Sequence, residues 1–291
     1  ELIKSSSEHF HDVYELNDNA LYELMISHRL DVLIELAGHT SANRLPMLQH
    51  RLAKVQLTGI GYPPTTGLAT VDGKFLDRYI LTNDSAAYYT EEPVVLPGSF
   101  WCFDPMEEAV INDTPAVERN GYVTFACVGN LAKMNSRMFS LWKEILGGTP
   151  GSRLLIRSIG FEDAAALRKI KETLSSAGLP MDRVDIKLPE GGKAFFDSYN
   201  EIDVILDTFP FNGGTTTCFA TYMGVPVVTL YGHSLISRMG LSIVSNLGFP
   251  ELAADDGDKY VSAAIRVASD SGYLRMFRGS IRDRFKNSSL G

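Results

Sequence analysis

The chain has 291 residues, of which 45% are hydrophobic and 21% charged, as in a globular protein of one large or two ordinary domains. A net charge of -8 argues against a general surface for nucleic acid or for anionic membranes. The sequence contains no apolar run of the roughly 20 residues that a membrane span needs, and no signal peptide opens it. We therefore expect a cytoplasmic protein that binds neither nucleic acid nor membrane.

Cysteines and paired histidines suggest neither a disulfide framework nor a metal site. Cys102, Cys127 and Cys218 are scattered and odd in number, and the last two stand in apolar contexts that favour buried free thiols. His9 and His11 have a metal-like spacing, but no carboxylate or cysteine companion supports a metal site there. We expect no metal.

The first part of the chain predicts short elements with long loops between them. In order, we expect a helix capped near residue 17, a strand at 32–36, a helix at 42–52, a strand at 55–58, and strands at 79–81 and 94–96. Residues 104–120 are rich in acidic and turn residues and show little periodicity. We therefore predict one domain over residues 1–115 and a second over residues 116–291.

The second part alternates strands and helices more regularly. We expect strands at 122–128, 154–157, 184–188, 203–207 and 226–230, and helices after 135 and near 163–176, 194–200, 215–223, 236–246, 259–269 and 272–286. Such alternation predicts parallel βαβ units, and hence an α/β fold with a doubly wound sheet. Ligands bind beyond the carboxyl ends of such strands. The loops at 129–133 and 209–217 are expected to emerge there together.

The run LDTFPFNGGTTTCFATYMGVPVVTL, at 206–230, carries the most specific local signal. A strand leads through Gly213 and Gly214 to a helix that opens with Thr215, Thr216 and Thr217. The free N–H groups and positive dipole at a helix N-terminus suit a phosphate, and glycine permits close approach. These five residues are therefore candidates for binding a phosphorylated ligand. An ordinary strand–loop–helix link with a threonine cap explains the same residues.

Five motifs stand in order along the chain: DVLIELAGHTSANR (31–44), VQLTGIGYPPTTGL (55–68), GNLAKMN (129–135), DVILDTFPFNGGTTTC (203–218) and MGVPVVTL (223–230). Together they resemble the catalytic region of the O-linked N-acetylglucosamine transferase family, glycosyltransferase family 41, and above all its SPINDLY-like and bacterial members. The resemblance implies a GT-B fold, with Rossmann-like parallel sheets that carry helices on both faces. It further implies that the N-terminal domain is incomplete in this sequence.

The same resemblance implies roles for individual residues of the second domain. Lys133 matches a lysine that binds the donor diphosphate and stabilises the leaving nucleotide, although a loop lysine is by itself commonly a solvated one. Asn130 matches a polar side chain beside the nucleotide, while Thr215 and Thr216 match a pair that contacts the diphosphate. Gly214 stands where animal members have histidine. Phe195 stands where they have another histidine near the base, and its ring could keep a stacking contact.

Two further side chains have open roles. His39 is the only histidine on a motif loop of the first domain, and it could act as a general base or hold the sugar. A structural histidine bonded across its loop is the alternative. Arg238 could contact phosphate or a helix end, or simply form a surface salt bridge.

The function implied is an inverting, metal-independent transfer of a sugar to serine or threonine of an acceptor protein. The donor, which is the only small molecule required, is UDP-N-acetylglucosamine by default and GDP-fucose as the alternative. Phe219 departs from the family, whose acidic residue at that position bonds the ribose hydroxyls. A non-catalytic nucleotide-binding or protein-interaction remnant therefore remains an alternative, as does a sugar-nucleotide epimerase of the same fold.

Overall fold

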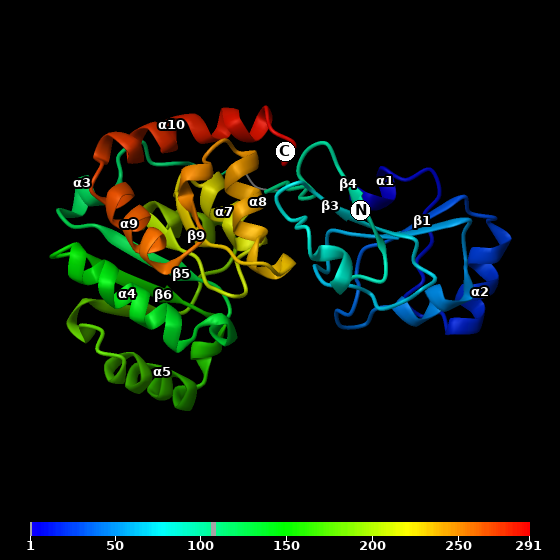
Figure 1. Ribbon diagram of the computed structural model, residues 1–291, viewed down its shortest axis with the longest axis horizontal. Helices are drawn as coiled ribbons and strands as arrows, with labels where there is room; N and C mark the ends of the chain where they lie inside the picture. The colour runs from blue at the N-terminus through cyan, green and yellow to red at the C-terminus, as the bar shows by residue number, and fades with distance from the viewer. Residues whose placement is uncertain (1, 106–108) are drawn as a thin grey trace. The chain divides into compact units, whose positions relative to one another are not determined.

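The computed structural model describes residues 2–105 and 109–291 (Figure 1). The chain divides into two compact units, one of Glu1–Phe75 with Ala86–Val94 and the other of Leu76–Ser85 with Val95–Gly291. The segment before residue 105 packs with the second unit because the Phe103 backbone N–H donates to Leu290 O at 2.7 Å and the Phe103 ring is buried. Packing thus divides the chain earlier than residue 115. That residues 1–115 serve the acceptor and residues 116–291 bind the donor stays a prediction.

The first unit is built on a small sheet whose strands follow the order β1-β2-β3-β4 among the described residues. β1 to β3 are parallel, and their register places Glu35 opposite Thr58 and Thr58 opposite Lys74. The strands are β1 (Val32–Glu35), β2 (Val55–Thr58), β3 (Gly73–Leu76) and β4 (Glu92–Val95). The helices are α1 (Leu2–Ser5) and α2 (Asp18–Ser27), with 3-10 turns η1 (Leu45–His50) and η2 (Ser85–Tyr88).

Two predicted elements of the first part of the chain are wrong. The helix expected at 42–52 is only the 3-10 turn η1, since the chain has positive φ angles of 59° at Ala42 and 48° at Arg51. The strand expected at 79–81 is a turn. The Asp77 carboxylate accepts hydrogen bonds from the backbone N–H groups of Tyr79 and Ile80, at 2.9 and 3.0 Å, which pulls this segment out of an extended conformation.

The second unit contains a parallel sheet of order β10-β9-β8-β5-β6-β7. Its strands are β5 (Thr124–Val128), β6 (Arg153–Arg157), β7 (Val184–Lys187), β8 (Val204–Leu206), β9 (Val227–Leu230) and β10 (Ala253–Ala254). Its helices are α3 (Ala116–Asn120), α4 (Ser136–Gly148), α5 (Ala164–Ser176), α6 (Gly192–Asp197), α7 (Thr215–Tyr222), α8 (Met239–Asn246), α9 (Gly257–Ala268) and α10 (Ser271–Lys286). The predicted α/β architecture is confirmed.

Helices cover both faces of this larger sheet (Figure 1). α4 and α9 pack against each other, and α7 and α8 pack against each other and against β9. The apolar faces of these helices meet a sheet core in which Phe125, Trp142 and Tyr260 have no exposed surface. The central strands β5, β8 and β9 are buried along almost their whole length, as a doubly covered parallel sheet requires.

The chain leaves the middle of this sheet in two directions. From β5 it proceeds outward to β6 and β7, then returns to β8 beside β5 and proceeds the other way to β9 and β10. The loops that follow β5 and β8 therefore separate at the carboxyl edge and leave a crevice. In open α/β sheets this reversal of strand order is where ligands bind.

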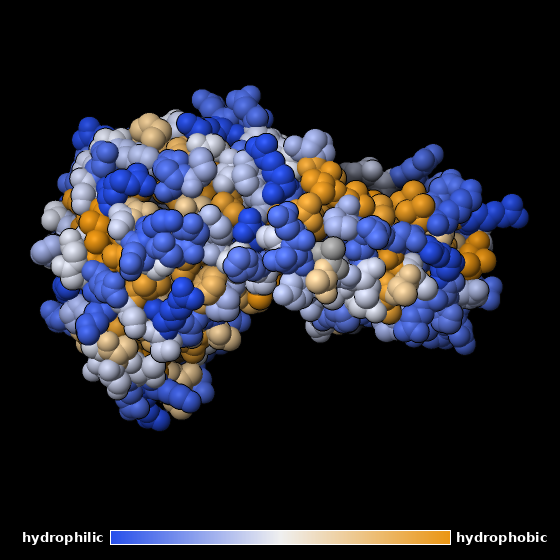
Figure 2. All heavy atoms as spheres, in the orientation of Figure 1, coloured by the Kyte–Doolittle hydropathy of each residue, from blue (hydrophilic) through white to orange (hydrophobic). Residues whose placement is uncertain are grey.

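Apolar and charged side chains are interspersed on the surface (Figure 2). On the first unit, the exposed apolar residues include Val32 and Ile34 of β1, the edge strand of its sheet, and Leu36 directly after it. Within the described ranges, no helix combines the length and the apolar character needed to cross a bilayer. Cys127 and Cys218 are buried free thiols, as predicted, and Cys102 is exposed.

Candidate functional site

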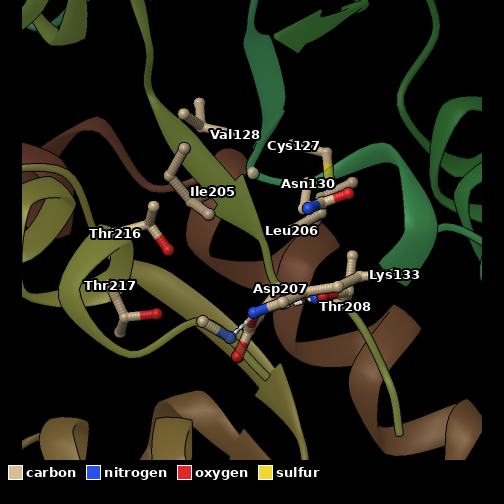
Figure 3. A pocket seen from close by; sticks show the side chains of 12 residues that line it. Cys127, Val128, Asn130, Lys133, Ile205, Leu206, Asp207, Thr208, Thr216 and Thr217 are labelled. Atoms are coloured by element: carbon tan, nitrogen blue, oxygen red, sulfur yellow. Dashed lines mark hydrogen bonds between the residues drawn. The ribbon is translucent and has the colours of Figure 1, made fainter. Parts of the chain in front are cut away.

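A cavity lies where the loops after β5 and β8 separate (Figure 3). It is lined from one side by Gly129, Asn130 and Lys133, and from the other by Gly213, Thr216 and Thr217, together with residues of the two strand ends: Cys127, Val128, Ile205, Leu206, Asp207 and Thr208. The two loops expected to emerge at one edge of the sheet thus contribute to one site. That prediction is confirmed.

Lys133 reaches the second loop from the first. Asn130 caps the short turn η3 (Leu131–Lys133) by accepting from the Ala132 N–H at 2.9 Å, which brings Lys133 to the cavity. The Lys133 Nζ donates to Asn212 O at 2.9 Å and lies 3.8 Å from the centre of the Phe211 ring. Burial lowers the pKa of Lys133, while the Asp207 carboxylate opposes the change. The cavity therefore holds a cationic group that is partly removed from water.

Asp207 organises the second loop. Its Oδ1 accepts from the backbone N–H groups of Gly213 at 2.7 Å and Thr208 at 2.9 Å, and its Oδ2 accepts from Thr229 Oγ1 at 2.7 Å. The side chain is almost fully buried, and burial raises its pKa to about 6 against the opposing effect of these bonds and of Lys133. Asp207 thus holds Thr208, at the start of the loop after β8, close to Gly213 at its end. It was not among the residues predicted from the sequence, although an acid directly after a buried strand was a usable signal.

The glycines of this loop are required by close packing. A Cβ atom at Gly213 would lie 2.4 Å from Thr217 Oγ1 and 2.8 Å from Thr216 Oγ1. At Gly214 it would lie 2.5 Å from the Trp101 ring. The histidine that the resemblance implies for animal members at this second position would have no room here, because the indole fills the space.

The N-terminus of α7 closes the cavity. Gly214 is its N-cap and supplies no side-chain cap, so the first N–H groups of the helix are not satisfied by a capping side chain. The hydroxyls of Thr216 and Thr217 stand in the cavity wall beside them (Figure 3). An ammonium group, helix amides and hydroxyls therefore converge, as binding of a diphosphate requires.

Not all predicted residues reach this cavity. Asn130, Lys133, Gly213, Thr216 and Thr217 line it, whereas Gly214 and Thr215 stand at the helix start without lining it: the first is packed against Trp101 and the second is exposed. The predicted contacts of all these residues with a donor stay predictions.

Phe195 and Phe219 pack against each other. Their ring centroids are 5.6 Å apart at 84°, and Phe196 and Phe103 also contact the Phe219 ring, at 5.2 Å each. This aromatic group explains how phenylalanine is accommodated where the family has an acid. A carboxylate at 219 would be surrounded here by rings that offer it no hydrogen bond.

His39 and Arg238 are placed outside this cavity. His39 is exposed in the first unit, where its Nε2 bonds to Thr66 O at 2.9 Å. Arg238 belongs to the second unit and donates to the carbonyl oxygens of Tyr79 and Gly232, at 2.7 and 2.8 Å. Arg238 therefore binds backbone carbonyl oxygens and forms no salt bridge among the described residues, while its contact with phosphate stays a prediction.

Comparison with known proteins supplies the family. The model of Glycosyl transferase family 41 matches residues 117–291. A probable UDP-N-acetylglucosamine–peptide N-acetylglucosaminyltransferase SPINDLY of Petunia hybrida is 37% identical over 281 residues, which are 96% of this chain and 30% of that protein. The chain therefore spans less than a third of the length of this curated relative.

Solved structures agree on the fold. A mutant of the Thermobaculum terrenum O-GlcNAc transferase superposes with a TM-score of 0.91 at 29% identity, over 99% of this chain and 55% of that one. Sucrose-phosphate synthase from Thermosynechococcus elongatus superposes with a TM-score of 0.60 at 12% identity, over 96% and 75% of the two chains, and supports the fold alone. The two parallel sheets are those of a GT-B fold. The chain belongs to glycosyltransferase family 41.

Proposed function

We propose that this chain is the catalytic region of a protein O-glycosyltransferase, which moves a sugar from a nucleotide donor to serine or threonine of an acceptor protein. The observation that supports it most is the convergence of Lys133 and the N-terminus of α7 on one cavity at the reversal of strand order. UDP-N-acetylglucosamine is the default donor because the curated relatives carry that donor in their names. GDP-fucose is the alternative donor.

The proposed chemistry needs no metal. As the acceptor oxygen bonds to the anomeric carbon from the opposite face, the bond to the diphosphate breaks and its electron pair leaves with the diphosphate. Negative charge therefore grows where Lys133, the amides of α7 and the hydroxyls of Thr216 and Thr217 can stabilise it. His39 is the proposed base for the hydroxyl proton, with holding of the sugar as the alternative role.

Calorimetric titration of the 291-residue chain with UDP and with GDP tests the proposal. We expect binding of at least one of them, and roughly 10- to 150-fold weaker binding in Lys133→Met, since a hydrogen bond to a charged group contributes about 1.5–3 kcal/mol. Lys169→Met, on the exposed side of α5, is the matched control and should bind as the wild type does. Equal affinity in all three proteins would refute the role of Lys133.

A second candidate is a non-catalytic remnant of such an enzyme, which one observation favours. Phe219 offers no acceptor for the ribose hydroxyls and is packed among Phe103, Phe195 and Phe196. If neither nucleotide binds at millimolar concentration, this candidate replaces the first. Transfer of sugar to an acceptor peptide would exclude it.

A further inference from the structure

A buried group of charges lies beside the loop that carries His39 in the first unit. Glu35 and Thr58 end β1 and β2 and are paired in register, Lys74 near the start of β3 pairs with Thr58, and Glu91 directly precedes β4. Lys74 is 2% and Glu91 3% exposed. Charges buried to this extent are costly unless each has partners. Their partners therefore indicate what the group does.

Glu35 holds the His39 loop from its start. Its carboxylate accepts from the Ala37 N–H at 2.6 Å and from the Gly38 N–H at 2.8 and 2.9 Å. Gly38 has a φ of +53°, and a Cβ atom there would lie 2.2 Å from the Tyr62 Cβ. The backbone just before His39 is thus clamped between a carboxylate and the tyrosine.

Glu91 holds the segment that His39 contacts. Its Oε1 accepts from the Thr66 backbone N–H at 2.6 Å and from the Thr66 hydroxyl, and its Oε2 accepts from Thr65 Oγ1 at 2.7 Å. Burial alone would raise the pKa of Glu91, but these hydrogen bonds bring the pKa below its ordinary value. Glu91 is therefore ionised at neutral pH and keeps the Thr66 carbonyl in one orientation.

Lys74 holds Tyr62, and its charge is influenced by both carboxylates. Its Nζ donates to Tyr62 O at 3.0 Å, so it holds the tyrosine that packs on the His39 loop. Burial lowers the pKa of Lys74 to about 8, while the charges of Glu91 and Glu35 oppose that change. The three charges thus restrain residues 37–38, 62 and 65–66, which include the Thr66 carbonyl that His39 contacts.

The contact between His39 and Thr66 fixes the position of a proton. A carbonyl oxygen only accepts, so the 2.9 Å bond from Nε2 to Thr66 O requires the hydrogen on Nε2. In the neutral ring the lone pair is then on Nδ1, for which no described residue provides a partner. We propose that Glu35, Lys74 and Glu91 are positioning residues that hold His39 as the Nε2–H tautomer, so that Nδ1 takes the proton from the acceptor hydroxyl.

The role of His39 as a base rests on the proposed function. The tautomer of His39, and its dependence on Glu35, Lys74 and Glu91, do not. In the transfer step, the Nδ1 lone pair takes the hydroxyl proton while the oxygen bonds to the anomeric carbon and the diphosphate leaves with its electron pair. His39 becomes an imidazolium that donates from both nitrogens, and Thr66 O accepts one of those bonds.

Nitrogen-15 NMR of the histidine side chains tests the inference on the full chain. The His39 signals, assigned by their loss in His39→Gln, should show a protonated Nε2 and an unprotonated Nδ1 in the neutral ring. Glu91→Ala should give the averaged shifts of exchanging tautomers, and Glu91→Gln should restore the Nε2–H form in part. Glu92→Ala, an exposed carboxylate one residue further, is the control and should leave the tautomer unchanged.

The inference is overturned if wild-type His39 carries its proton on Nδ1 or exchanges between tautomers, a result that does not depend on any Glu91 variant. It is also overturned if a folded Glu91→Ala protein keeps the wild-type tautomer, or if His39→Gln transfers sugar at the wild-type rate. Failure of UDP and GDP to bind would instead remove the proposed function and leave the NMR result standing. The two failures are therefore distinguishable.

Discussion

Asp207→Asn is the substitution whose effect the structure defines most fully. The amide keeps the shape of the carboxylate, and its oxygen can still accept from the backbone N–H groups of Gly213 and Thr208. The Thr229 hydroxyl can reverse its role and accept from the new NH2 group. The substitution removes the ionisable group. It therefore also removes the pH dependence that this buried carboxyl gives to the free energy of unfolding.

The magnitude follows from the pKa of Asp207. Burial raises it from an ordinary value of 3.8 to about 6, which at 1.36 kcal/mol per pKa unit corresponds to about 3 kcal/mol. Because the folded state holds the proton more tightly, this contribution is favourable below the unfolded-state pKa and is lost as pH rises through the folded-state value. The free energy of unfolding of the wild type, relative to that of Asp207→Asn, should therefore fall by about 3 kcal/mol, mostly between pH 4 and pH 6.

Urea unfolding at several pH values measures this difference. Both tryptophans of the chain, Trp101 and Trp142, belong to the second unit, so their fluorescence follows the unit that contains Asp207. Asp258→Asn, an exposed carboxylate on α9, is the control. Wild-type and Asp207→Asn curves that stay parallel from pH 4 to pH 7, or that diverge in the opposite direction, would refute the reasoning.

Three further predictions concern packing and exposure in the second unit. Gly214→Ala should destabilise the protein by about 1–3 kcal/mol, because its Cβ overlaps the Trp101 ring; Trp101→Ala in the same chain should relieve the strain, and a purely additive double mutant would contradict this. Asn212→Ala leaves two buried carbonyl oxygens without their donor and should cost about 2–4 kcal/mol in urea unfolding. Cys102 should be the one thiol of the native chain that reacts rapidly with a disulfide reagent at neutral pH, since it is exposed and the other two cysteines are buried; three fast thiols would contradict the core packing.

The second part of the chain was predictable because the apolar residues that recur in its sequence pattern are the ones buried in its core. Strands apolar on both sides and helices with one apolar face leave one arrangement, a parallel sheet covered twice. From that arrangement it follows that two loops distant in sequence share one edge. The meeting of Lys133 with Thr216 and Thr217 could therefore be expected from the sequence pattern.

What could not be predicted depends on contacts between residues far apart in the chain. Nothing local in the sequence indicates that Trp101 occupies the space beside Gly214, or that Phe195 packs on Phe219. The turn at 79–81 was also missed because of a side-chain contact, here a local one. The Asp77 carboxylate binds backbone N–H groups that strand pairing would otherwise use. Apolar periodicity does not report such side-chain competition.

In the proposed function, a diphosphate lies at the N-terminus of α7 beside Lys133. Amide NMR of the chain during titration with UDP or GDP tests it most directly, since it reports the place of binding as well as the affinity. We expect the largest shifts at Gly213 to Thr217 and at Asn130 to Lys133, with saturation. Saturable binding that leaves both segments unshifted would contradict the account.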